Sequence, residues 1–417
     1  MKTLIKNVVL NNEKKDILIE NNIFSKIDDK IEIDADIEID ATNKVILPAF
    51  YNTHTHAGMN ILRGAGDDKE LFTWLNEDIW PIEAKLNDED IYISTKFAIL
   101  EMIKSGCVFF NDMYFSQKSI MKAIDEMGVR GVVSIVEFDM FDKEQTEKKK
   151  KDTIDFLEMK NLCPDRIIKA VSCHSVYTVS EELLDFASKV AKEYNTFLHI
   201  HASETLKEVV DCHNKYNKSP IEKLDEYGLL TEKTILAHCV HCDDNDIDII
   251  NKHKSAISHC PVSNLKLNSG QMPLQKMLDK GCLITLGTDG ASSNNSLSII
   301  DEMKISALSA KIQAHSPTAG TAKDIFKITT YNGANFFNIN AGEIKENKLA
   351  DFILCDLNNY HLQPNYNLIS NIVYSADNSV ITDVFCNGKH LMKDGKIEKE
   401  KEIIEEFKQC VERLKNK

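Results

Sequence analysis

The sequence predicts a (β/α)8 TIM barrel joined to a small composite β-sandwich domain built from both chain ends. In the middle of the chain, short apolar runs alternate with segments of helical spacing, a pattern typical of a parallel barrel. Both ends carry short strand-like runs without this alternation. We therefore expect 49–344 to form the barrel, and 1–48 and 345–417 to form the sandwich and a terminal helix.

Eight apolar runs are expected to be the strands of the barrel, because each has the length of a buried strand. They lie at 45–53, 107–113, 129–138, 167–173, 196–201, 234–239, 255–260 and 283–288. Helical spacing separates most of them, as at 91–103, 181–191 and 274–278.

The two chain ends contain hairpin signals. Near the start, the apolar runs 8–10 and 17–19 flank a polar turn. Near the end, Asn387-Gly388 separates two more runs, and this dipeptide strongly favours a tight hairpin. The segment 398–417 is charged with apolar residues at helical spacing, which predicts the terminal helix.

Composition narrows the classes of function. The 417 residues are 43% hydrophobic and 28% charged, so a packed core is expected. The net charge of −15 argues against binding to nucleic acid or to anionic membranes, and no run of 18 apolar residues predicts a membrane span. Eleven cysteines, an odd number, predict free thiols in a reducing, cytoplasmic location.

A His-x-His pair follows the first predicted strand, in the run Thr53-His54-Thr55-His56. Residues two apart on a strand point to the same side, so His54 and His56 are placed to grip one metal ion. Taken alone, such a pair more often has a structural role.

Three further strand ends carry chemistry-bearing residues. His201 ends the apolar run 196–201, and Glu204 follows it, where a carboxyl would face a cleft or simply begin a helix. His238 closes the run 234–239, and Asp289 follows the eighth run, where a turn is the alternative explanation.

Together these positions predict a metal site. Barrel enzymes place their catalytic groups at the carboxyl ends of strands, where His54, His56, His201, His238 and Asp289 would all lie. Imidazoles with a carboxylate suit Zn²⁺, or another divalent ion such as Fe²⁺ or Mn²⁺.

The motifs around these residues resemble those of the amidohydrolase superfamily, and within it the 5-methylthioadenosine/S-adenosylhomocysteine deaminase family. The likeness covers nearly the whole chain. It rests on His54-Thr-His56-Ala-Gly-Met-Asn-Ile-Leu-Arg63-Gly64, Trp74 to Glu83, His174-Ser-Val-Tyr177, His201-Ala-Ser-Glu204, Ala237-His238-Cys-Val-His241, Pro261-Val-Ser-Asn264-Leu-Lys-Leu and Gly287-Thr-Asp289-Gly-Ala-Ser-Ser-Asn294-Asn295.

The resemblance implies a role for each matched residue. One zinc ion would be held by His54, His56, His201 and Asp289. His238 would contact the attacking water or the substrate, and Glu204 would protonate the purine ring. Substrate contacts would also come from Glu83, which would accept hydrogen bonds from the ribose hydroxyls, and from His174.

The implied reaction is hydrolytic deamination at C6 of an adenosine-type nucleoside, to the inosine analogue and ammonia. Methylthioadenosine, S-adenosylhomocysteine, 5′-deoxyadenosine and adenosine are the candidate substrates, and a homo-oligomer is implied. The family's arginines for the 5′ substituent are not evident, since no arginine follows Arg130 until Arg166. This favours a 5′ group without negative charge, unless Lys143 or the run 148–151 replaces them.

Two other functions compete with this one. An aminohydrolase acting on a guanine, pterin or triazine ring would use the same metal site, but it would not need a carboxylate for ribose at Glu83. A non-catalytic binder or sensor on the same barrel would be expected to lose a site residue, and none is lost. Trp74 and Trp80 are expected to pack in the core or a lid, with purine stacking as the alternative.

Overall fold

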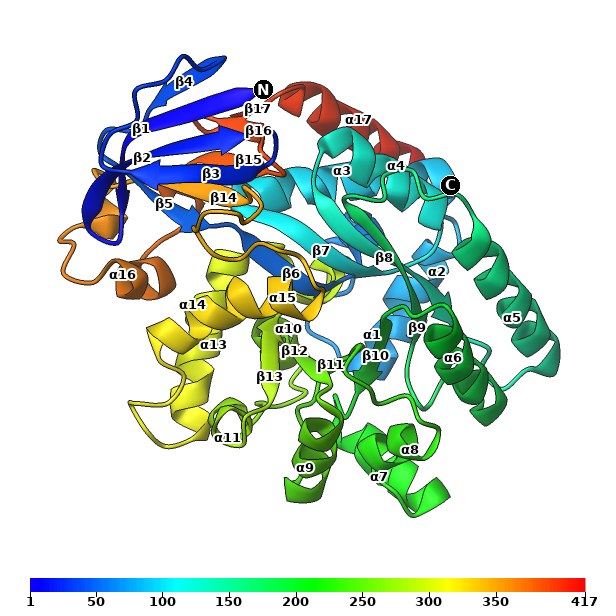
Figure 1. The fold of residues 1–417 in the computed structure, drawn as a ribbon. Coiled ribbons are helices and arrows are strands. Elements are labelled where there is room, and N and C mark those ends of the chain that lie inside the picture. The colour runs from blue at the N-terminus through cyan, green and yellow to red at the C-terminus, as the bar shows by residue number, and fades with distance from the viewer. Residues whose placement is uncertain (417) are drawn as a thin grey trace.

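A parallel barrel and a mixed sheet make up the protein, whose computed structural model describes residues 1–416. The middle of the chain forms an eight-stranded sheet that curls into a nearly closed barrel, and both chain ends contribute to a separate nine-stranded sheet (Figure 1). The predicted fold class is therefore confirmed.

The barrel strands follow one another in chain order, each parallel to its neighbour. They are almost entirely buried, because side chains fill the barrel and helices cover it outside. Their bounds are β6 (Phe50–Thr55), β7 (Cys107–Met113), β8 (Arg130–Glu137), β9 (Ile167–Cys173), β10 (Leu198–Ala202), β11 (Thr234–His238), β12 (Ala256–His259) and β13 (Leu283–Leu286).

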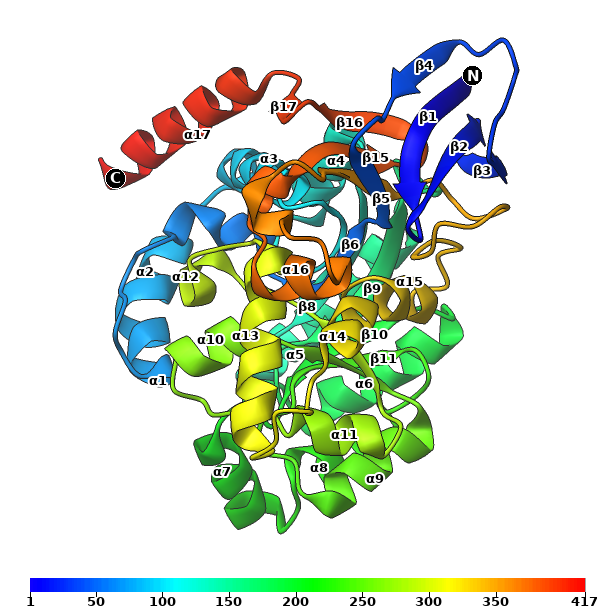
Figure 2. The same cartoon turned by 90° about the vertical axis from the view of Figure 1, so that its left-hand side faces the viewer.

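Helices surround the barrel and separate its strands along the chain (Figures 1 and 2). Many begin with a side chain that caps the first turn, as Asn87 and Ser180 do. Their bounds are α3 (Asp88–Lys104), α4 (Gln117–Met127), α5 (Lys143–Glu158), α6 (Glu181–Glu193), α7 (Leu206–Tyr216), α8 (Pro220–Glu226), α9 (Asp244–His253), α10 (Pro261–Lys266), α11 (Leu274–Asp279), α12 (Ala291–Asn294), α13 (Ile299–Gln313), α14 (Ala322–Thr329) and α15 (Tyr331–Phe336).

The seam between β13 and β6 brings two site residues together. The backbone N–H of Asp289 donates to the carbonyl of His54 at 2.9 Å, and the Thr53 hydroxyl donates to the carbonyl of Leu286 at 2.9 Å. Gly287 permits this approach, because a Cβ there would lie 2.9 Å from the backbone nitrogen of His54. Barrel closure thus fixes Asp289 beside the His-x-His strand.

The second sheet combines strands from both ends in the order β17-β16-β15-β14-β5-β1-β2-β3, with β4 beside β1. The predicted hairpin at Asn387-Gly388 joins β15 to β16. The strands are β1 (Lys2–Leu10), β2 (Glu13–Glu20), β3 (Ile23–Asp28), β4 (Ile37–Asp40), β5 (Lys44–Pro48), β14 (Phe352–Asp356), β15 (Ile381–Cys386), β16 (Lys389–Lys393) and β17 (Lys396–Ile397).

One predicted strand is divided in the structure. The run 45–53 was expected to be a single barrel strand, but β5 ends at Pro48 and pairs with β14, while β6 begins at Phe50. Both pieces are apolar because both are buried, so hydrophobicity alone does not reveal the break. The domain limits proposed from the sequence stay a prediction.

The C-terminal helix predicted from 398–417 is α17 (Glu400–Lys415), which packs along α3 (Figure 2). Phe97 and Phe407 stack there with ring centroids 4.0 Å apart. A further helix, α16 (Leu368–Tyr374), lies between β14 and β15 in the chain. Within residues 1–416, no helix combines the length and the apolar character needed to cross a membrane.

Candidate active site

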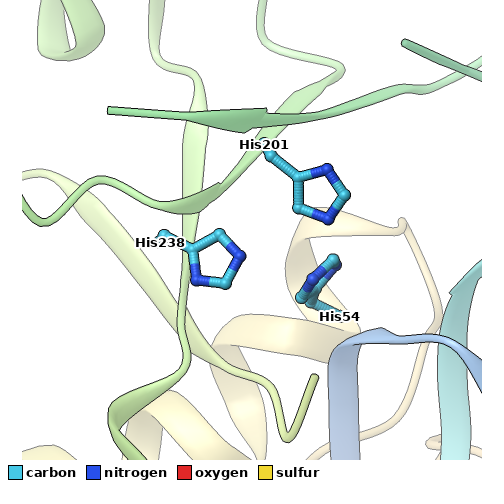
Figure 3. Close-up of side chains that lie close together, drawn as sticks. All are labelled: His54, His201 and His238. Atoms are coloured by element: carbon cyan, nitrogen blue, oxygen red, sulfur yellow. The ribbon is translucent and has the colours of Figure 1, made fainter. Parts of the chain in front are cut away.

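The five residues predicted to hold or face a metal ion come together at one end of the barrel. His54 lies in β6, His201 in β10 and His238 at the end of β11, and their rings face one another in Figure 3. His56 follows β6, and Asp289 follows β13. The position is the carboxyl end of the strands, where barrel enzymes carry their catalytic groups.

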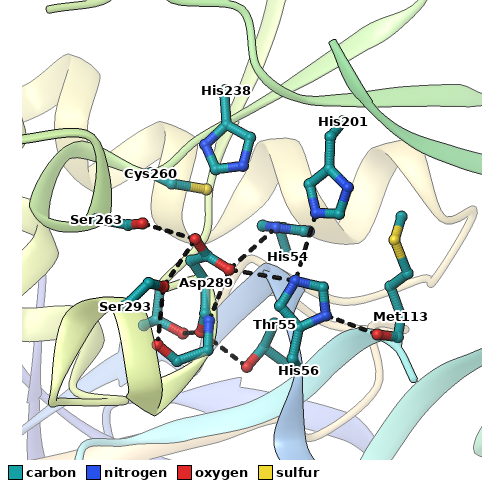
Figure 4. Close-up of polar contacts among 12 residues, drawn as sticks. His54, Thr55, His56, Met113, His201, His238, Cys260, Ser263, Asp289 and Ser293 are labelled. Atoms are coloured by element: carbon teal, nitrogen blue, oxygen red, sulfur yellow. Dashed lines mark hydrogen bonds and ion pairs between the residues drawn. The ribbon is translucent and has the colours of Figure 1, made fainter. Parts of the chain in front are cut away.

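Their ligand atoms converge on one small space (Figure 4). Oδ1 of Asp289 lies 3.4 Å from Nε2 of His54 and 3.3 Å from Nε2 of His56. Nε2 of His201 lies 3.3 Å from Nε2 of His56. Two overlapping groups, His54-His201-His238 and His54-His56-Asp289, each keep their ligand atoms within 4.8 Å of one another.

This donor set fits a divalent ion. Nε2 of His54 is fully buried and has no hydrogen-bond partner among the residues described, so a polar atom without a partner faces the shared space. Imidazole nitrogens with one carboxylate are the donors that zinc and similar ions prefer.

The outer nitrogens of three rings are held by carbonyl oxygens. Nδ1 of His56 lies 2.6 Å from the carbonyl of Met113, and Nδ1 of His201 lies 2.7 Å from the carbonyl of His174. Nδ1 of His238 lies 2.8 Å from the side-chain oxygen of Asn264. Because a carbonyl only accepts, each Nδ1 carries a proton, and in the neutral ring Nε2 is then the nitrogen with the lone pair.

Asp289 is fixed as a carboxylate. The hydroxyls of Ser263 and Ser293 donate to its Oδ2 at 2.6 and 2.9 Å, and the N–H of Gly290 donates to its Oδ1 at 2.7 Å. Burial alone would raise the pKa of Asp289, but its contacts with His54 and His56 outweigh burial and hold that pKa well below its ordinary value. The group is therefore ionised at neutral pH.

Glu204 lies beside His238, with 3.8 Å between its Oε2 and Nε2 of the ring. Burial raises the pKa of Glu204, so this carboxyl holds its proton to higher pH than an exposed glutamate. The carboxylate of Glu208 accepts hydrogen bonds from the backbone N–H groups of Ser203 and Glu204, at 3.2 and 2.8 Å. Glu208 thus holds the loop that presents Glu204.

Left-handed backbone marks three of these loops. Ser203 has φ 51°, His238 has φ 76° and Asp289 has φ 64°. Residues with a side chain seldom adopt this conformation, and such strain concentrates at functional sites.

A cavity of about 670 Å³ opens in front of this cluster. It is lined by His56, His201, His238, Glu204 and Asp289, and by the other two residues predicted to contact substrate, Glu83 and His174. The Tyr114 hydroxyl donates to Glu83 at 2.7 Å. All eight residues predicted for the site therefore border one space or lie directly behind it.

A short cover segment forms one wall of the cavity. It comprises η1 (Ala57–Leu62), α1 (Leu71–Trp74), the π-turn η2 (Leu75–Ile79) and α2 (Trp80–Glu83). Trp74 and Trp80 both line the cavity, and Trp80 also meets Phe138 edge-on. The two tryptophans therefore both pack the cover and present apolar surface to a ligand.

Two other histidines lie outside the cluster. Nε2 of His241 lies 2.6 Å from the carbonyl of Ser269. His259 is buried, and neither of its ring nitrogens has a hydrogen-bond partner in the described part of the chain.

Four residues that support the site were not predicted from the sequence: His199, Ser263, Asn264 and Glu208. Ser263 and Asn264 stood in a recognised motif without an assigned role. His199 lies two residues before His201 on β10, so strand alternation was a signal for it. Nothing local in the sequence pointed to Glu208.

A parallel barrel whose strand ends gather imidazoles and a carboxylate defines the class of barrel hydrolases that use a divalent ion. Comparison with known proteins agrees, since the Amidohydrolase family pattern matches residues 45–391. The chain belongs to the amidohydrolase family. Its similarity to curated deaminases makes it a hydrolytic deaminase of that family.

The chain is similar to proteins named 5′-deoxyadenosine deaminase. One from Methanococcus maripaludis is 43% identical over 414 residues, which cover 97% of this chain and 98% of the relative. One from Methanocaldococcus jannaschii is 43% identical over 398 residues, covering 94% of each chain.

Solved structures share the fold. An adenosine deaminase from Xanthomonas campestris with bound zinc has a TM-score of 0.92 and 26% identity, with 100% of this chain and 98% of that chain covered. A guanine deaminase from C. acetobutylicum has a TM-score of 0.85 at 23% identity, covering 94% and 100%, and at that identity only the fold is compared.

Proposed function

We propose that the protein removes ammonia from C6 of an adenosine-type nucleoside, giving the inosine analogue, and that 5′-deoxyadenosine is a principal substrate. One observation carries the proposal: Glu204 and Glu83 border the same cavity as the imidazole–carboxylate cluster. The names of the relatives at 43% identity support the choice of substrate.

The proposed metal ligands are His54, His56, His201 and Asp289, and the proposed ion is zinc, with Fe²⁺ or Mn²⁺ as alternatives. Support comes from the mixed nitrogen and oxygen donor set and from the zinc-bound adenosine deaminase of similar fold. A divalent ion there supplies a water molecule acidic enough to ionise near neutral pH.

Each catalytic residue has a proton task in this scheme. Glu204 donates its proton to N1 of the purine, which makes C6 electrophilic. Asp289 accepts the proton of the attacking water, and His238 donates or accepts a hydrogen bond to the oxygen that adds to C6. Asp289 then passes its proton to the C6 amino group, which leaves as ammonia, and the C6 hydroxyl returns a proton to Glu204 as the carbonyl forms.

The ribose is assigned to Glu83. Its carboxylate would accept hydrogen bonds from the two ribose hydroxyls, while Tyr114 holds one carboxylate oxygen. His174 borders the cavity beside His201, with ring centroids 5.0 Å apart, and it is assigned a contact to the substrate.

The 5′ substituent is expected to be uncharged. Val136, Phe138 and Met140 give the cavity an apolar wall, and no lysine or arginine lines it in the part of the chain that the structure describes. Of the run 148–151, Lys149 turns inward, but it donates to the carbonyl of Val136 at 3.0 Å and lines a neighbouring cavity. A methyl or methylthiomethyl group suits this wall better than a carboxylate.

The proposal is tested by assaying adenosine, 5′-deoxyadenosine, methylthioadenosine and S-adenosylhomocysteine with zinc-loaded protein. We expect ammonia and loss of adenine absorbance, with kcat/KM lowest for S-adenosylhomocysteine. Free adenine and guanine serve as controls that lack ribose. Release of ammonia from the bases but from none of the four nucleosides would favour the aminohydrolase of another heterocycle.

Two further predictions from the sequence belong with this proposal. We expect a homo-oligomer, which light scattering measures, and a cytoplasmic location. A small-molecule substrate is supported by the cavity, whose size suits a nucleoside.

A further inference from the structure

His54 differs from the other imidazoles of the cluster in what holds its outer nitrogen. Its Nδ1 lies 2.9 Å from Nε2 of His199, and the two rings meet at 88°. His199 is buried on β10, two residues before His201, and it does not line the cavity. It therefore lies one layer deeper in the barrel than the proposed ligands.

An imidazole partner leaves the proton of His54 undecided, whereas a carbonyl partner would fix it. The position of that proton depends on Asn111 on β7, because its amide nitrogen lies 3.1 Å from Nδ1 of His199. The same nitrogen donates to the carbonyl of Thr53 at 2.9 Å. The hydrogen-bonded chain His54–His199–Asn111 therefore joins side chains of β6, β10 and β7 inside the barrel.

We propose that His199 and Asn111 are positioning residues that set the tautomer of His54, and so the affinity of the cluster for its ion. The inference rests on the proposed role of His54 as a metal ligand. A ligand at Nε2 requires the proton of His54 on Nδ1, donated to Nε2 of His199. His199 then carries its own proton on Nδ1 and needs an acceptor at Asn111.

Asn111 itself carries an unused acceptor. Oδ1 of Asn111 is buried and has no hydrogen-bond partner within residues 1–416. A turn of the amide brings this oxygen to His199, in exchange for the bond to Thr53. The ion-loaded site thus needs Asn111 to accept a hydrogen bond from His199, whereas in the present orientation Asn111 donates one to it.

The test measures zinc affinity by competition with a chromophoric chelator, without substrate. We expect His199→Phe to weaken zinc binding by about 10- to 100-fold. His199→Gln, which keeps an acceptor, should recover part of the loss. Asn111→Leu should also weaken binding, while Asn111→Asp, an acceptor only, should bind zinc at least as tightly as the parent.

His259→Phe is the matched control, since His259 is an equally buried imidazole on β12 without a hydrogen-bond partner among the residues described. It should leave zinc affinity within about twofold of the parent. With zinc saturating, KM of His199→Phe should match the parent, because His199 does not line the cavity. Thermal unfolding of the metal-free forms checks that each variant is folded.

Three outcomes overturn the inference: His199→Phe binding zinc as the parent does, His259→Phe losing as much affinity as His199→Phe, or Asn111→Asp losing as much as Asn111→Leu. If His199→Phe does not fold, the zinc affinities of Asn111→Leu and Asn111→Asp decide whether the inference holds. A parent protein that binds no zinc would instead contradict the proposed metal centre itself, so the two failures are distinguishable.

Discussion

Asn264 accepts a hydrogen bond from His238 over 2.8 Å, and the residue before it, Ser263, donates to Asp289 over 2.6 Å. Both side chains project from α10, which begins at Pro261, directly after β12. One short helix therefore orients two groups of the candidate site that lie 51 positions apart in the chain, at the ends of β11 and β13.

Loss of the Asn264 contact should slow catalysis without releasing the ion. We expect Asn264→Ala to lower kcat by about 10- to 100-fold, because His238 loses the partner that fixes its tautomer and ring angle. Asn264→Asp should retain most activity, since a carboxylate accepts the same bond. Zinc content, measured alongside kcat, should be unchanged in both variants; a loss of zinc would make His238 a ligand.

Removing the acid should abolish turnover. Glu204→Gln keeps the size of the side chain but has no proton to give, so we expect kcat to fall by about 10²- to 10⁴-fold with zinc content intact. In the parent, activity should decline on the alkaline side as Glu204 ionises, and its raised pKa moves that decline upward from the range of an exposed glutamate. An unchanged kcat in Glu204→Gln would assign the proton donor elsewhere.

The assignment of Glu83 to the ribose is tested by comparing two substitutions and two nucleosides. Glu83→Ala should raise KM for 5′-deoxyadenosine by about 10-fold or more, because the ribose hydroxyls lose a charged acceptor. A nucleoside that lacks both hydroxyls should bind the parent poorly and should be insensitive to the substitution. Tyr114→Phe, which leaves the carboxylate in place, is the control and should have the smaller effect on KM.

Buried carboxyls should make the protein less stable as the pH rises. Burial raises the pKa of Glu137 from 4.5 to about 8, although Thr153 donates a hydrogen bond to it. The folded state then holds a proton that the unfolded chain releases near 4.5, so the unfolding free energy falls between these pH values. Glu137 contributes at most about 1.4 kcal/mol per pH unit to this slope.

Chemical denaturation at several pH values checks this. The unfolding free energy of Glu137→Gln should fall less steeply with pH than that of the parent. The difference should appear between pH 4.5 and about 8, the ordinary and the raised pKa of Glu137. The exposed Glu144 on α5 provides the control, and Glu144→Gln should keep the parent slope. Parallel curves for the parent and Glu137→Gln would place the Glu137 pKa near its ordinary value.

Much of the barrel was predictable from the sequence because its strands are buried on both sides. Continuous apolar runs such as 107–113 and 167–173 coincide with β7 and β9. The prediction of one strand at 45–53 was wrong, because β5 and β6 are both buried and adjoin in the chain although they belong to different sheets. Pairing with β14, about 300 residues away, decides that break, and no local pattern contains it.

Two local patterns made the site residues predictable. His54 and His56 were found from the alternation of side chains along a strand, and His201 and Asp289 were found from their places at or after the end of a strand. Supporting contacts were not predictable in the same way, because they join distant segments: Asn264 reaches His238 from another strand's loop, and Asn111 reaches His199 across the barrel. Such partners depend on the closed geometry of the sheet.

The location of the ion tests the central claim most directly. Anomalous diffraction at the zinc absorption edge, from crystals of zinc-loaded protein, gives the position of the metal without reference to any substrate. We expect one strong peak per chain, surrounded by Nε2 of His54, His56 and His201 and by a carboxylate oxygen of Asp289. No peak among these four side chains, with Asp289 turned away from the histidines, would contradict it.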